Sequence, residues 1–281
     1  MTRDMPISTY REFRPPPALA SHVLCVWSQV IGAGEIFYRH RVLPDGCADV
    51  VWIGEAPAVV AGPATGPVMV PLAPGTVVAG VRLRPGAAAV LGPPASALSN
   101  RDTPLRDLWG ADPLSGRIAE QGSVEAKLAA AEAMLVMRLA DAGPPDRGIV
   151  AATRWLARHP TGRIEDLAVL LDTGPRQLHR RFAAAVGYGP KTFQRVLRLQ
   201  RALALAARSP ESLAALAADA GYADQAHMSR EVQALTGQTP RVLLQGPQST
   251  LALSDLFKTG PRQSSKKRHR IQSRRRSWSN V

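Results

Sequence analysis

The sequence predicts an α+β multidomain protein: a β-rich N-terminal domain, an all-α domain of two helix-turn-helix units joined by a long helix, and a disordered basic tail. Short β-branched and aromatic runs between turn signals are confined to residues 1–100, and helical periodicity replaces them after residue 147. The net charge also becomes more positive toward the C-terminus. Residues 1–144 carry a net −1, residues 145–246 a net +6 and residues 247–281 a net +8.

The first domain, residues 1–143, contains runs with strand character at 23–31, 48–53 and 76–83. Their spacing, with Pro/Gly punctuation between them, is typical of a sandwich or barrel. A helix is expected over 124–139, where apolar residues recur at helical spacing. The Gly-Pro-Pro-Asp segment at 143–146 interrupts this pattern, so the domain boundary is placed there.

The second domain, residues 147–246, lacks strand signals. A short helix, a glycine-containing turn and an amphipathic helix occur in it twice, about 50 residues apart. This repeat of architecture predicts two helix-turn-helix units. The expected helices are 148–158, 163–171, 175–186, 190–207, 212–219 and 224–236.

In the first unit, residues 163–186, the second helix begins at Pro175, where the missing N–H of proline costs nothing. Leu178, Phe182 and Val186 are spaced four residues apart and are expected to face the core. The outer face then carries arginine, glutamine and histidine. Arginine can bond O6 and N7 of guanine, and glutamine N6 and N7 of adenine, so this face suits contact with base edges.

The second unit, residues 212–237, has the same plan. Gly221 closes its turn, and the side chain of Asp224 can cap the following helix. Met228, Val232 and Leu235 are expected to form the buried stripe of that helix.

Ten residues are candidate DNA contacts. Lys191 and Arg195 on the long helix are expected to touch phosphate, which fixes register without reading sequence. That helix would be roughly 27 Å long, which suits two recognition helices about one DNA turn, 34 Å, apart. The other eight lie on the outer faces of the two second helices: Arg176, Gln177, His179, Arg180, Gln225, Ala226, His227 and Arg230.

At these positions the stretch resembles the DNA-binding domain of the AraC/XylS family of bacterial transcription regulators, over about 100 residues. The resemblance implies a sequence-specific transcriptional regulator that places one recognition helix of each unit in successive major grooves of double-stranded DNA. If it is an activator, RNA polymerase is a further partner. The matching residues are Leu178, Arg180, Phe182, Gly187, Pro190, Phe193, Arg198, Ala202, Leu216, Ala217, Gly221, Tyr222, Asp224, His227, Arg230, Gly237, Thr239 and Pro240.

Three positions depart from the family pattern. Gly174 stands where a serine cap is usual, Ala226 replaces a common serine, and Val232 replaces a phenylalanine of the second core. Glycine at a cap costs only a few tenths of a kcal/mol relative to serine. The second unit is therefore expected to be the more loosely packed and weaker reader.

The N-terminal region resembles a poorly characterised β-rich partner domain of some AraC-type regulators, through segments 10–13, 26–27, 43–49 and 82–87. By this resemblance it senses a small-molecule effector or makes a homodimer. Residues 44–46 are interpreted as a hairpin tip, with a ligand site as the alternative. A pocket lined by Trp27, Trp52 and Arg82 is a further hypothesis.

Composition narrows the function classes. No apolar stretch reaches 18 residues and the N-terminus lacks a signal peptide, so a cytoplasmic, nucleoid-associated protein without a membrane partner is expected. No common enzyme or metal motif occurs, and Cys25 and Cys47 are expected to be reduced packing residues. No enzyme activity, cofactor or metal is therefore predicted.

One alternative function is a DNA-targeted enzyme resembling alkylation-repair proteins, which would need an activated cysteine or a metal site. Another is an architectural DNA binder that acts through the tail alone, against which the polar outer faces of both recognition helices argue. The basic tail, residues 247–281, either adds phosphate contacts that steepen the salt dependence of binding or has no role.

Overall fold

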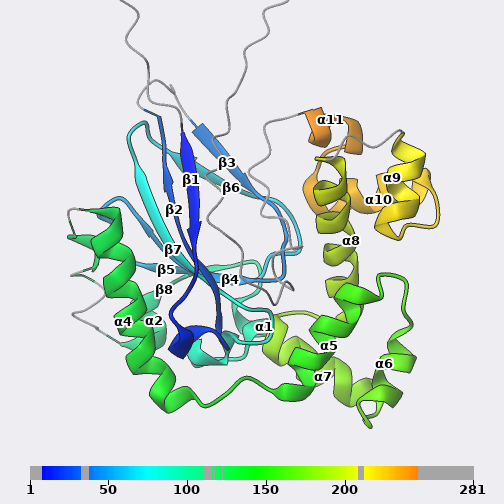
Figure 1. Cartoon of the computed structure of the whole chain (residues 1–281), viewed down its shortest axis with the longest axis horizontal. Coiled ribbons are helices and arrows are strands. Elements are labelled where there is room, and N and C mark those ends of the chain that lie inside the picture. Colours follow the sequence, from blue (N-terminus) through cyan, green and yellow to red (C-terminus); the bar gives the residue numbers. More distant parts are fainter. Residues whose placement is uncertain are drawn as a thin grey trace, which may run out of the picture.

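In the computed structural model, residues 8–32, 38–110, 116, 118–121, 123–207 and 212–245 are described. A β-rich domain and a helical domain lie side by side, as the sequence predicts, with the long helix α8 (Pro190–Ala206) facing the strands (Figure 1). The predicted tail, residues 247–281, lies outside the described residues.

The β-rich domain is built on a six-stranded antiparallel sheet with the order β1-β2-β7-β4-β5-β8 and a two-stranded sheet formed by β3 and β6. The strands predicted at 48–53 and 76–83 are its central pair, β4 and β7, which align Val50 with Val81. The strands are β1 (Thr9–Phe13), β2 (Val23–Val30), β3 (Tyr38–Val42), β4 (Ala48–Ile53), β5 (Val59–Ala61), β6 (Val68–Leu72), β7 (Val77–Leu83) and β8 (Asp102–Pro104).

Both faces of the large sheet are covered. Alternate residues of β4 point to opposite faces, so Trp52 packs on one side with Leu135 of α4 (Val124–Ala142), and Val51 packs on the other with Leu72 of β6. The N-cap of α4 is Ser123, whose side chain accepts a hydrogen bond from the amide of Ala126. This domain also contains the short helices η1 (Pro17–Leu19), η2 (Ala88–Leu91), α1 (Ala95–Leu98) and α2 (Leu105–Trp109).

Residues 44–46 do not form a hairpin tip. They connect β3 of the small sheet to β4 of the large sheet. The connection is packed against α8: a Cβ atom added at Gly46 would lie 2.5 Å from Cε2 of Phe193. The turn residues therefore mark a contact between the two domains, which a local reading of the sequence does not reveal.

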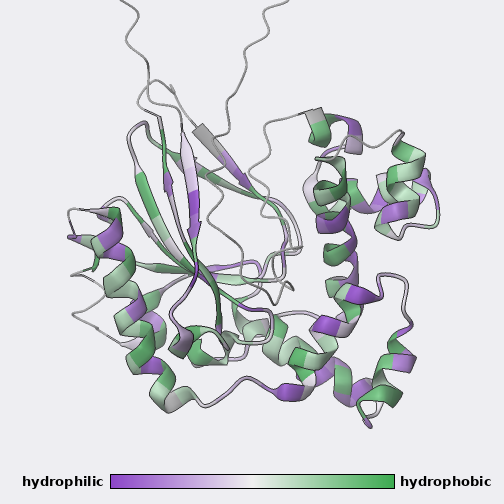
Figure 2. Cartoon of the chain, viewed as in Figure 1, coloured by the Kyte–Doolittle hydropathy of each residue, from purple (hydrophilic) through white to green (hydrophobic). Residues whose placement is uncertain are grey.

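The helical domain follows the predicted order, and its helices alternate hydrophobic and hydrophilic residues (Figure 2). One cluster of buried side chains runs through it, from Ile149 to Leu243, and it also includes Cys47 of the β-rich domain. Its helices are α5 (Arg147–Arg158), α6 (Ile164–Leu170), α7 (Pro175–Val186), α8, α9 (Leu213–Ala220), α10 (Gln225–Thr236) and α11 (Pro240–Gln245).

Candidate nucleic-acid interface

The first helix-turn-helix unit consists of α6 and α7. Its turn contains Asp172 with a positive φ of 46°, and Pro175 occupies the first turn of α7. Phe182 is fully buried and meets Phe193 of α8 with ring centroids 5.4 Å apart. Since Leu178 and Val186 are buried as well, the orientation of α7 about its axis is fixed.

That orientation leaves the predicted reading face of α7 in solvent. The side chains of Arg176, Gln177, His179 and Arg180 are all exposed. Within the described part of the chain, neither Arg176 nor Arg180 forms an ion pair. The imidazole of His179 lies against Gly189, where a Cβ atom would come within 2.4 Å of Nε2. His179 therefore sits at the edge of this face.

The next arginine of α7 is differently placed. Arg181 pairs with Asp146, the N-cap of α5, at 2.8 Å. Burial raises the pKa of Asp146, but the hydrogen bonds and charge of Arg181 and the backbone amides outweigh it and hold the pKa below its ordinary value. Arg181 thus anchors α7 to α5, while Arg180 beside it remains available.

The second unit consists of α9 and α10. Gly221 ends α9 with a φ of 90°, and Asp224 caps α10 by accepting a hydrogen bond from the amide of His227 at 2.6 Å, as predicted. Met228, Val232 and Leu235 are buried. Gln225, Ala226 and Arg230 are exposed.

Gln233 also lies on the exposed side of α10, although it is not among the residues predicted from the sequence. It is exposed and follows Ala226 and Arg230 at i+7 and i+3, so the three share one side of α10. The helical spacing itself could have identified it. The face of α10 is thus longer than the motif alone suggests.

Two predicted contacts, Arg195 and His227, also form ion pairs within the protein. Glu231 of α10 pairs with Arg198 at 2.8 Å, with Arg195 at 3.2 Å and with Nε2 of His227 at 3.3 Å. Burial raises the pKa of Glu231, but hydrogen bonds from Arg198 and His227 and the charge of Arg195 outweigh it, so the pKa lies below its usual range. This cluster fastens α10 to α8, a role that the pattern of motif residues did not indicate.

Lys191 remains a candidate for phosphate contact. It is exposed in the first turn of α8, and its Nζ lies 3.1 Å from Oε1 of Gln194. The predicted contacts thus lie on α7, on α10 and on α8, the helix that joins the other two.

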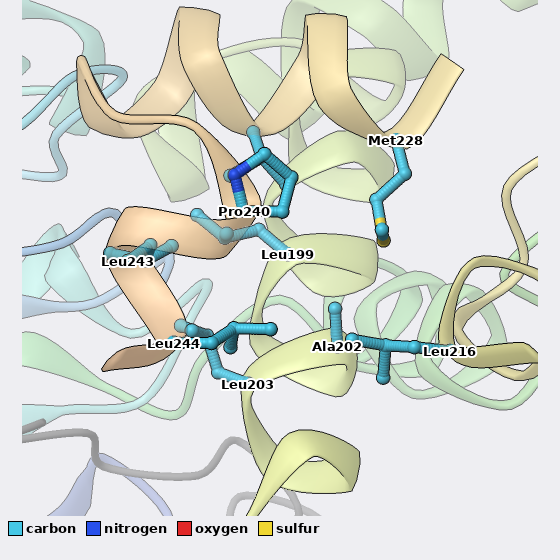
Figure 3. A pocket seen from close by; sticks show the side chains of 9 residues that line it. Leu199, Ala202, Leu203, Leu216, Met228, Pro240, Leu243 and Leu244 are labelled. Atoms are coloured by element: carbon cyan, nitrogen blue, oxygen red, sulfur yellow. The ribbon is translucent and has the colours of Figure 1, made fainter. Parts of the chain in front are cut away.

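The core of the second unit contains an apolar cavity of about 10 Å³, shown in Figure 3. Leu199 and Leu203 of α8, Met228 of α10 and Leu243 of α11 point toward it. Val232, where the family pattern has phenylalanine, also lines it.

The pocket suggested for the β-rich domain does not form as expected. Trp27 and Arg82 do lie together, since both donate to Oδ1 of Asp49, at 2.7 Å and 3.1 Å. Trp52 lies on the opposite face of the sheet, in the cluster under α4. The reason is the two-residue alternation of β4, which separates Trp52 from Asp49.

Both cysteines of the chain lie within the described residues. Cys25 and Cys47 are free thiols, and burial raises the pKa of each, which disfavours the nucleophilic thiolate. Across the described residues no group of His, Cys, Asp or Glu side chains could hold a metal ion. Likewise, no described helix has the length and apolar character needed to cross a membrane.

Two family models match separate parts of the chain. Residues 167–246 match the family model described as a helix-turn-helix domain, and residues 11–104 match a domain of unknown function (DUF6597). No curated protein matches the sequence significantly.

The similar solved structures include ToxT from Vibrio cholerae in a P21 crystal form, at 10% identity and a TM-score of 0.43, covering 84% of this chain and 97% of that one. Unsaturated fatty acid bound wild-type ToxT from strain SCE256 is similar at 10% identity and a TM-score of 0.39, covering 86% and 97% of the two chains.

Proposed function

We propose that this chain is a DNA-binding transcription regulator with a specific mode of reading DNA. The helix-turn-helix domain that residues 167–246 match supports this proposal. One chain recognises two adjacent segments of a DNA site, with α7 in one major groove and α10 in the next. Arg176, Gln177 and Arg180 contact base edges in the first segment. Gln225, Ala226 and Arg230 do so in the second.

The observation that carries this proposal is the pair of exposed polar faces at equivalent positions of two units. Arg180 on α7 and Arg230 on α10 lie 50 residues apart in sequence and are both exposed. The helix between them, α8, has 17 residues and is about 25 Å long. Its length suits two helices about 34 Å, one turn of DNA, apart.

Phosphate contacts complete the interface. Lys191 supports the first unit, while His179 and Arg195 lie at its edge. His227 is proposed to act through Glu231, which already holds its ring, and so to orient the start of α10. The role of the basic tail stays a prediction from sequence.

The β-rich domain is proposed to regulate binding, through an effector or through dimerisation. Its direct packing against α8 supports this, since Gln200 donates to the carbonyl of Pro44 at 2.7 Å. A change in the β-rich domain therefore reaches the helix that joins the two reading units. RNA polymerase as a partner and a cytoplasmic, nucleoid-associated location belong to the same proposal.

In vitro selection from a random duplex library with the full-length chain tests this function. We expect an enriched site with two conserved segments about 10 base pairs apart. We expect it to bind at least about 10³-fold tighter than a scrambled duplex at one salt concentration. Recovery of random sequence would rule out sequence-specific reading.

A further inference from the structure

The β-rich domain holds both recognition helices by their C-terminal ends, and we propose that this fixes the operator spacing that the protein accepts. Arg41 and Ser99 are the positioning residues. This inference rests on the proposed function, and it adds a role in specificity for residues that never touch DNA.

The two helix ends are equivalent points of the repeat. Gly187 follows the last residue of α7 and Gly237 follows the last residue of α10, and each glycine has a positive φ (107° and 70°). Three residues after each glycine, a proline begins the next helix. The last carbonyl groups of a helix lack partners within it and carry its negative dipole end. Both ends therefore offer the same kind of acceptor.

At the end of α7, the acceptor is used by Ser99, which follows α1. Its Oγ donates to the carbonyl of Gly187 at 2.7 Å; the carbonyl of Ala95, at 3.3 Å, is farther away. A Cβ atom at Gly187 would come within 2.5 Å of this Oγ and 3.0 Å of Pro63. The absence of a side chain at Gly187 thus allows the β-rich domain to approach this closely.

At the end of α10, Arg41 of β3 contacts the carbonyl one residue before the glycine. Its Nη1 donates to the carbonyl of Thr236 at 2.9 Å, and the positive guanidinium suits the negative end of the helix. A Cβ atom at Gly237 would lie 3.8 Å from Pro67 and 4.0 Å from Nη1 of Arg41. Each helix end thus meets one donor side chain and one proline of the β-rich domain.

The two prolines belong to one short segment. Pro63 and Pro67 both lie in the connection between β5 and β6. They are four residues apart, a length of chain that spans at most about 14 Å. Asn100 fastens this connection: its backbone N–H donates to the carbonyl of Pro63 at 3.2 Å, and its side-chain Oδ1 accepts from the backbone N–H of Thr65 at 2.8 Å. The separation of the two helix ends is therefore set by a braced segment of the β-rich domain.

Within the helical domain, the two units are joined mainly through α8. Contact at both ends by one braced body restricts rotation of either unit about that helix. Each base pair added between two half-sites moves the second by about 3.4 Å and turns it by about 35°. Helices held in this way should therefore discriminate between spacers that differ by one base pair.

The experiment uses the full-length chain and the selected DNA site, with the spacer between its two segments shortened or lengthened by one or two base pairs. Dissociation constants are measured by fluorescence anisotropy at one salt concentration for wild type and for Arg41→Ala/Ser99→Ala. Base preference within each segment is measured separately. The matched control, Arg11→Ala/Ser96→Ala, removes the same charge and hydroxyl from exposed positions of the β-rich domain.

We expect wild type and control to lose about tenfold or more in affinity one base pair from the optimal spacer, and the Arg41/Ser99 variant to lose less than about threefold. Base preferences within the segments should not change. A spacer profile in the variant equal to that of wild type would overturn the proposal, as would a flat profile in wild type. If no site is selected at all, the proposed function fails instead. Thermal unfolding checks the fold, and Arg41→Gln and Ser99→Ala alone give the same test if the double variant unfolds.

Discussion

Exposed arginines on a helix are common, so the distinction between Arg180 and Arg181 is informative. Arg181 is paired with Asp146, whereas Arg180 projects from the outer face of α7. The sequence alone presents two adjacent arginines and cannot separate these roles. Only the position of Asp146, 35 residues earlier in the chain, does so.

Arg180→Ala is expected to weaken binding to the selected site by about 1–3 kcal/mol, because an arginine bidentate to guanine contributes about that much. Arg181→Ala removes the same charge one residue away and is the control, with an expected loss in affinity below about 1 kcal/mol. Anisotropy titrations at constant salt measure both. Equal losses for the two variants would mean that Arg180 contributes charge only.

Glu231 gives a prediction about stability and pH. Its pKa is lower in the folded chain than the ordinary value of about 4.3. The Glu231 carboxylate therefore makes its full contribution to the free energy of unfolding above its ordinary pKa, and this contribution is lost as pH falls through the lower pKa of the folded chain. Glu231→Gln should cost about 2 kcal/mol at pH 7, since charged hydrogen bonds to Arg198 weaken.

Urea unfolding at several pH values tests this. Between about pH 5 and pH 3, wild type should lose more stability than Glu231→Gln, and the difference between them should shrink. Glu165→Gln, at an exposed glutamate of α6, should follow wild type. Parallel curves for wild type and Glu231→Gln would show that the cluster does not stabilise the fold.

At the scale of elements, strong periodicity predicted position well. The helix expected at 175–186 and the strand at 48–53 have those bounds in the structure. β3 and β6 were not predicted, because their sequences lack a clear strand pattern: β3 includes charged residues and β6 a proline. Each has five residues and pairs only with the other in the described sheets. The connection at 44–46 was misread because its partner on α8, Gln200, lies 156 residues away.

The cavity in the second unit leads to a prediction at this scale. Val232→Ile adds one methylene beside the cavity and should stabilise the chain by up to about 0.8 kcal/mol. Val196→Ile makes the same change at a fully buried position of α8 that does not line the cavity, and should cost about 1–3 kcal/mol. Urea unfolding compares the two. Destabilisation by both would show that the cavity cannot accept the added group.

For the whole molecule, the close packing of the two domains at Gly46 can be measured. Gly46→Ala should destabilise by about 2–4 kcal/mol, because φ is +83° and the new Cβ atom would meet Phe193. Gly75→Ala has a similar φ of +78° with nothing within 4 Å, so it isolates the backbone cost of about 1–2 kcal/mol. If both variants lose the same stability, Phe193 accommodates the added methyl group and the packing at Gly46 is not as close as described.

One chain is proposed to read two DNA segments, each with its own helix. Site selection with wild type, Arg180→Ala and Arg230→Ala tests this proposal. Each variant should lose base preference at one position of one segment and keep the other segment unchanged. Selection of the wild-type site by both variants, or loss of preference across both segments in either one, would contradict it.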